Sequence, residues 1–212
     1  MLHKMYVFCI IGILLTACNA NQRKENDPAA ETQYLQSWND GNAKAAIVHF
    51  VQMATDSVSK AFIPENERIA VFDNDGTLWS EQPMYFQLAY VMYYIRNHID
   101  DNPEWLGNPY VHALLQNDYA FIFSSGENAL MHLSMLSHAN MSAGAFQSAV
   151  HEWLANDRHP VTGKAYTQMV YQPMLELLEY LRANGFKTFI VSGGGTDFMR
   201  VWAKEVYGIP PY

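Results

Sequence analysis

Residues 69–77 read IAVFDNDGT, and this stretch decides the fold. The apolar run 69–72 has no polar interruption and ends at a group of turn-forming residues. A short apolar run bounded by turn residues is typical of a buried strand in a parallel sheet. The sequence therefore predicts a strand whose carboxyl end carries Asp73 and Asp75.

A second unit of the same design lies near the end of the sequence. Residues 173–183 predict a helix that begins with proline and stops before an Asn-Gly pair. Residues 187–191 (KTFIV) predict the next strand, followed by a glycine-rich loop, 192–195 (SGGG), and a helix starting at Thr196. Two strand–loop–helix units indicate an α/β protein with a Rossmann-like parallel sheet, whose ligands bind at the carboxyl ends of the strands.

Helical patterns precede and separate these strands. An early helix is expected from Asp40, its predicted N-cap, with one apolar face made of Ile47, Phe50, Val51, Ala54 and Val58. Residues 85–99, 125–138 and 142–156 predict amphipathic helices. Between the two predicted strands, no segment predicts a further strand. We expect residues 85–170 to form an inserted, all-helical cap over the ligand site.

The acid pair at the first strand suits phosphoryl chemistry. Asp73 and Asp75 are two residues apart, a spacing that puts both side chains on one side of an extended chain. One carboxylate can attack phosphorus, while the other protonates the leaving oxygen and later takes a proton from water. Both would lie beside a dianionic phosphate, so we expect Mg²⁺ to neutralise their repulsion. The alternative is that DNDG is only a turn, but the apolar strand before it and the matching loop 192–195 favour a site.

These segments resemble two motifs of the haloacid dehalogenase superfamily. Residues 71–78 (VFDNDGTL) resemble its first motif, and residues 189–194 (FIVSGG) resemble its second, in the form seen in phosphoserine-phosphatase-like members. The insertion resembles that group's helical cap. The resemblance implies a phosphomonoester hydrolase with Asp73 as nucleophile and Mg²⁺ ligand, and with Asp75 as the acid/base and a second Mg²⁺ ligand through its carbonyl. It also implies that the phosphoryl oxygens of the substrate are bound by Thr77, Ser192, Gly193 and Gly194.

The sequence also departs from the superfamily pattern. A lysine after the second motif and an acidic pair on a later strand do not follow within the 212 residues, and Lys204 is expected to point away from the site. We therefore expect an incomplete core, residues 34–84 and 171–212, in a C-terminally truncated product or incomplete gene model. Turnover should be impaired or absent, since one charge-stabilising group typically contributes about 3–4 kcal/mol. Two alternatives stay open: a non-catalytic envelope lipoprotein fragment that binds a phosphorylated ligand or partner, and a phosphotransferase on the same scaffold.

The first residues predict export. Lys4 precedes a short apolar run, and residues 15–18 (LTAC) resemble the lipobox of bacterial lipoproteins. We expect residues 1–17 to be a signal peptide, Cys18 to be lipid-modified and residues 18–33 to be a polar tether, although an ordinary secretory signal would also fit. The protein would then be anchored to the membrane at the cell envelope, periplasmic or extracytoplasmic. A net charge of −8 without a basic run argues against nucleic acid as a partner.

Overall fold

The computed structural model describes residues 34–138 and 141–211. The predicted signal peptide, Cys18 and the tether lie outside these residues. Among the residues it does describe, no helix is both long enough and apolar enough to cross a membrane.

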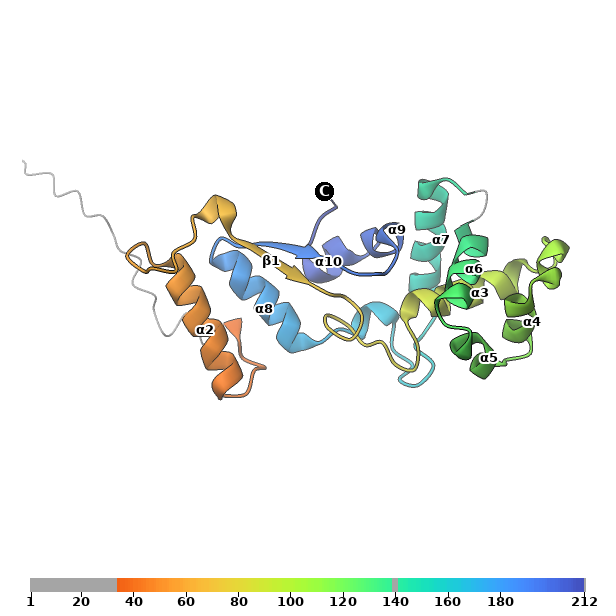
Figure 1. Ribbon diagram of the computed structural model, residues 1–212, viewed down its shortest axis with the longest axis horizontal. Coiled ribbons are helices and arrows are strands. Elements are labelled where there is room, and N and C mark those ends of the chain that lie inside the picture. The colour runs from red at the N-terminus through yellow and green to blue at the C-terminus, as the bar shows by residue number, and fades with distance from the viewer. Residues whose placement is uncertain (1–33, 139–140, 212) are drawn as a thin grey trace, which may run out of the picture.

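The architecture is helix-rich, with one small parallel sheet (Figure 1). The strands are β1 (Ile69–Phe72) and β2 (Lys187–Ile190). The α-helices are α2 (Asn42–Thr55), α3 (Phe86–His98), α4 (Pro109–Leu115), α5 (Tyr119–Ser124), α6 (Glu127–His138), α7 (Ala143–Asn156), α8 (Gln172–Ala183), α9 (Thr196–Arg200) and α10 (Ala203–Tyr207). The described residues also form short 3-10 helices, η1 (Glu65–Glu67), η2 (Pro103–Gly107) and η3 (Tyr166–Gln168).

The register of the sheet brings the ends of both strands together. β1 and β2 are parallel, as predicted, and Phe72 is the register partner of Ile190. One further hydrogen bond, from Val191 N to Phe72 O (2.8 Å), continues the pairing past the end of β2. The chain segments that follow the two strands therefore begin at the same edge of the sheet, where the sequence predicts the ligand site.

The prediction that the first strand is buried is wrong for one of its faces. Ile69 and Val71 are 58% and 59% exposed, whereas Ala70 and Phe72 pack with α2 and α8. Successive strand residues face opposite sides, and these helices cover only one side of the sheet (Figure 1). In the described part of the chain, β1 pairs with β2 alone.

Two helix predictions need correction near the ends of the chain. Helix α2 begins at Asn42, and its N-cap residue is Gly41. Asp40 forms an ion pair with Lys44 (3.1 Å) and does not cap the helix. Phe50 is exposed on this helix, and Val58 lies beyond its end at Thr55.

The single helix expected from Thr196 is divided into α9 and α10. The chain leaves helical geometry at Trp202, whose φ is −133° and whose ring is buried. Lys204 is exposed on α10.

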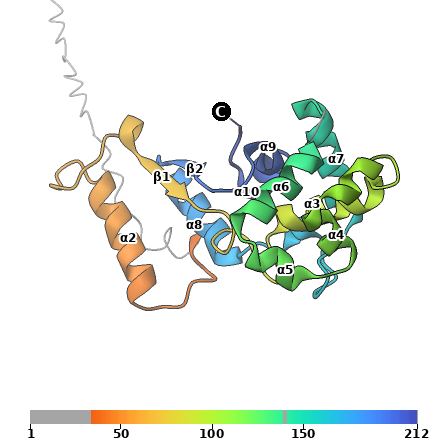
Figure 2. The same ribbon diagram turned by 45° about the vertical axis from the view of Figure 1, so that its right-hand side comes forward.

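Helices α3 to α7 gather at the end of the molecule opposite α2 (Figures 1 and 2). The predicted helices 85–99, 125–138 and 142–156 are confirmed as α3, α6 and α7, with the Ser142 side chain capping α7. The shorter α4 and α5 were not expected. The segments that enter and leave this region run side by side, since Ser80 N donates to Met169 O (2.9 Å). The division into core and cap domains stays a prediction.

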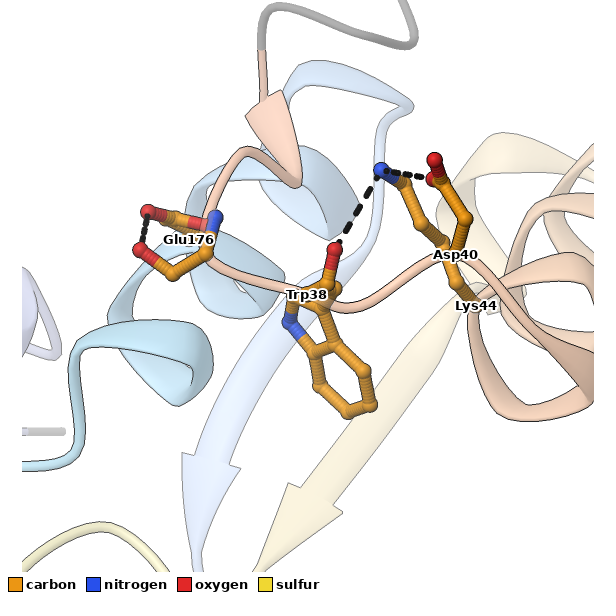
Figure 3. Close-up of polar contacts among 5 residues, drawn as sticks. Trp38, Asp40, Lys44 and Glu176 are labelled. Carbon is orange, nitrogen blue, oxygen red and sulfur yellow. Dashed lines mark hydrogen bonds and ion pairs between the residues drawn. The ribbon is translucent and has the colours of Figure 1, made fainter.

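The segment before α2 is fastened to α8 by polar contacts. Glu176 accepts hydrogen bonds from the backbone N (2.8 Å) and the Oγ (2.6 Å) of Ser37. The Trp38 indole N–H donates to Pro173 O (2.7 Å), and Lys44 reaches Trp38 O (3.5 Å) as well as Asp40 (Figure 3). Burial alone would raise the pKa of Glu176, but the hydrogen bonds from Ser37 and Gln172 and the charge of Lys44 together lower this pKa below its ordinary value.

Replacing Glu176 with glutamine should therefore destabilise the protein in a pH-dependent way. At pH 7 we expect the free energy of unfolding to fall by about 1 kcal/mol, since charge-assisted hydrogen bonds are lost. Because the folded-state pKa lies below the unfolded one, this contribution is complete above the unfolded value and is lost as pH falls through the folded value. Urea unfolding from pH 7 to pH 3 measures the difference. Glu179→Gln, an exposed change on the same helix, is the control, and an equal loss in both variants would contradict the assignment.

Candidate functional site

The loop after β1 folds around the carbonyl of Asn74. This oxygen accepts backbone hydrogen bonds from Thr77 (3.1 Å), Leu78 (2.8 Å) and Trp79 (3.3 Å). Gly76 closes the turn with a φ of +70°, a conformation that favours glycine. The result is a compact turn that holds residues 73–79 against the end of β1.

Asn74 also fastens this loop to the core by its side chain. Asn74 is buried, and its Oδ1 accepts a hydrogen bond from the Tyr207 hydroxyl (3.1 Å). Asp73 is exposed at the end of β1, and Asp75 is half-buried.

One oxygen of Asp75 is held by a buried tryptophan. The Trp79 indole N–H donates to Asp75 Oδ1 at 2.6 Å. Trp79 is itself fully buried, stacked on Trp202 with ring centroids 4.0 Å apart and in edge contact with Phe86 at 4.7 Å. The orientation of the Asp75 carboxyl is therefore set by the aromatic core.

The other oxygen of Asp75 faces the glycine-rich loop after β2. A Cβ added to Gly194 would lie 3.9 Å from Asp75 Oδ2 and 3.6 Å from Ser192 Oγ. Gly194 N donates to Ser192 Oγ (3.2 Å), and a Cβ at Gly193 would meet nothing within 4 Å. The acid pair and the glycine loop, predicted separately from the sequence, thus lie next to each other.

The electrostatics of the site raise the pKa of Asp75. Burial raises its pKa above the usual value, the hydrogen bond from Trp79 opposes the rise, and the negative charges of Asp73 and Glu81 add to it. A carboxyl whose pKa is raised is better suited to give a proton.

The donor set suits a hard cation in part. Asp73 and Asp75 supply carboxylate and carbonyl oxygens, the ligands that Mg²⁺ prefers. In residues 34–138 and 141–211, no group of three acidic, His or Cys side chains is arranged to hold a metal ion. Asp73 and Asp75 could therefore supply part of a Mg²⁺ coordination shell. Glu81 adds a third negative charge near the loop.

A small pocket opens beside the loop. It has a volume of 280 Å³ and is lined by Glu81, Gln82, Pro83, Met84, Tyr85 and Phe123. A Cβ at Gly76 would lie 3.0 Å from Glu81 Cδ, so this carboxylate packs directly against the turn. The pocket therefore lies between residues 81–85 and Phe123 of α5.

Sequence reasoning assigned no role to several residues that shape this site. Thr77, proposed from the motif, lies half-buried in the turn, whereas Asn74, Trp79 and Tyr207 were not proposed. The spacing of Trp79, four residues after Asp75, is a local signal that could have suggested a contact. No local pattern points to Tyr207, which is 133 positions from Asn74.

Trp79→Phe should raise the pKa of Asp75 further. The change keeps a buried ring but removes the N–H that stabilises the charged carboxylate. NMR titration of the Asp75 carboxyl carbon measures the shift. Trp153→Phe is a matched control, because the Trp153 indole also donates to an aspartate four positions away, Asp157 (2.7 Å). Coinciding Asp75 titrations in Trp79→Phe and the parent would count against the bond.

Comparison with known proteins gives a family. A model described as haloacid dehalogenase-like hydrolase matches residues 70–210, more than half of the chain. A comparison with curated proteins gave no match. The matched segment starts inside β1 and includes both loops of the candidate site. The chain belongs to the haloacid dehalogenase-like hydrolase family.

Proposed function

We propose that this hydrolase is a Mg²⁺-dependent phosphatase that cleaves small phosphomonoesters through an aspartyl-phosphate. The observation that carries the proposal is the approach of Asp75 Oδ2 to the glycine loop, 3.9 Å from a Cβ at Gly194. A phosphoryl group held by that loop would lie beside both carboxylates. Attack on phosphorus by one carboxylate and protonation of the leaving oxygen by the other can then occur in the same site.

Asp73 is the proposed nucleophile. It is exposed directly after β1, and its neighbour Asn74 is fixed in the core. In the first step an Asp73 oxygen forms a bond to phosphorus as the ester P–O bond breaks. In the second, water attacks phosphorus and releases inorganic phosphate and the Asp73 carboxylate.

Asp75 is the proposed acid and base. Its raised pKa favours the protonated form that gives a proton to the leaving alkoxide. The resulting carboxylate takes a proton from the water that attacks the aspartyl-phosphate. Trp79 holds Oδ1, which leaves Oδ2 on the side of the glycine loop for this exchange.

Thr77, Ser192, Gly193 and Gly194 are proposed to hold the phosphoryl oxygens through hydroxyl and backbone N–H groups. Asp73, by a carboxylate oxygen, and Asp75, by its carbonyl oxygen, would hold Mg²⁺. When bound, the cation supplies positive charge that offsets the repulsion between phosphate and carboxylates. The proximity of the two loops and the oxygen donors support this assignment.

The remaining sequence-based expectations are part of the proposal. We propose a phosphoserine-phosphatase-like arrangement, in which helices α3 to α7 form a cap over the loops. We also propose a lipid anchor at Cys18 and a location at the cell envelope, with no nucleic-acid partner. Impaired turnover by the 212-residue chain stays a prediction, so the test must detect the covalent intermediate as well as product.

Asp73→Asn should abolish both turnover of p-nitrophenyl phosphate and covalent phosphorylation. Asp75→Asn should slow turnover by about 10²–10⁴-fold, since the acid/base is lost. Because p-nitrophenolate leaves readily without a proton, the aspartyl-phosphate should accumulate in Asp75→Asn. Acid quenching and peptide mass spectrometry measure phosphate on the peptide that contains Asp73.

Asp101→Asn, an exposed change in the helical region, is the control for both variants. Turnover that survives in Asp73→Asn would contradict the assigned nucleophile. Stabilisation by phosphate without a covalent intermediate would indicate a binding protein, and transfer from Asp73 to an added alcohol in place of water would indicate a phosphotransferase.

Removing divalent cations should prevent phosphorylation of Asp73. With EDTA the repulsion between the phosphate dianion and the carboxylates is no longer offset, so the intermediate should not form. Added Mg²⁺ should restore it, measured by the same acid quench. Equal amounts of intermediate with and without EDTA would exclude the proposed cofactor.

A further inference from the structure

A glutamine from the helical region reaches the glycine loop. Gln87 lies in the first turn of α3, next to Phe86, whose buried ring packs on Trp79. Gln87 Oε1 accepts a hydrogen bond from Gly195 N at 2.7 Å, across 108 positions in the sequence. The first turn of α3 is therefore tied to the loop that follows β2.

The loop and the glutamine are in very close contact. A Cβ at Gly195 would lie 2.7 Å from Gln87 Nε2, and one at Gly194 would lie 3.4 Å from Gln87 Oε1. Gly195 has a φ of −66°, which any residue adopts. The backbone conformation therefore does not require glycine at position 195, and a side chain there would displace the Gln87 amide from its present position.

The same loop meets the acid pair on its other side. Gly194 lies between Gln87 and Asp75, since its added Cβ would approach Oε1 of the first and Oδ2 (3.9 Å) of the second. We infer that Gln87 is a positioning residue: by holding Gly195 N, it keeps the loop 192–195 in the arrangement that receives a phosphoryl group. This inference rests on the proposed function of the loop.

A purely structural contact of the same kind is available for comparison. Gln147 on α7 donates from Nε2 to Asp197 Oδ1 (3.1 Å), which also joins the helical region to α9. That bond lies past the loop and involves none of its backbone N–H groups. If Gln87 only helped to seat α9, loss of either glutamine would have the same consequence.

The test compares Gln87→Ala and Gln147→Ala in the full chain with Mg²⁺. Calorimetry with inorganic phosphate as the probe should show about tenfold weaker binding in Gln87→Ala, since one hydrogen bond that orders the loop is lost. Gln147→Ala should bind phosphate as the parent does. Amide hydrogen exchange should be faster at Gly195 in Gln87→Ala alone, at equal melting temperature.

A second pair of variants tests the contact itself. Gly195→Ala should weaken phosphate binding in the parent, because the new methyl group meets Gln87, and the same change should be tolerated in the Gln87→Ala background. Equal penalties in both backgrounds would show that the two residues do not meet.

Equal phosphate affinity in Gln87→Ala and the parent would overturn the positioning role, even if turnover is reduced in the variant. Failure to find phosphate on Asp73 would instead reject the proposed reaction, and the phosphate affinities of the two glutamine variants would still decide the role of Gln87. A chain that binds no phosphate at all would overturn both.

Discussion

The candidate site depends on the parallel register between β1 and β2. With Phe72 opposite Ile190, and Val191 N bonded to Phe72 O, the chains that leave the two strands start at one edge. A shift of one residue would turn each side chain to the other face of the sheet and separate the acid pair from the glycine loop. Ile69 and Val71 are exposed. Among the described residues, the two strands therefore keep this register with apolar side chains packed on only one face of β1.

Burial of aromatic rings gives the site its precision. Trp79 has an apolar ring and one N–H that must find an acceptor when water is excluded, and Asp75 provides it. The ring is packed between Phe86 and Trp202, which come from the helical region and from the end of the described chain. The orientation of the Asp75 carboxylate therefore depends on the packing of three separate segments of the chain.

Polar contacts link the helical region to the same edge. Gln87 meets Gly195, and Gln147 meets Asp197, so that the segment starting α9 is held from α3 and from α7. Of these two contacts, the one from Gln87 reaches the loop that is proposed to bind phosphate. A helix far from this loop in the sequence therefore contacts it directly.

Local pattern determined much of this protein by itself. The apolar runs before Asp73 and before Ser192 predicted two parallel strands, and apolar spacing predicted α3, α6, α7 and α8, because strand and helix periodicity depend on near neighbours in the chain. Tertiary structure alone decided that α2 and α8 cover one face of the sheet and that the helix after Thr196 is divided at the buried Trp202. It also decided that Trp79, Tyr207 and Gln87 reach the motif loops. Such contacts arise from packing between segments separated by up to 133 positions, and no local pattern encodes which buried donor meets which acceptor.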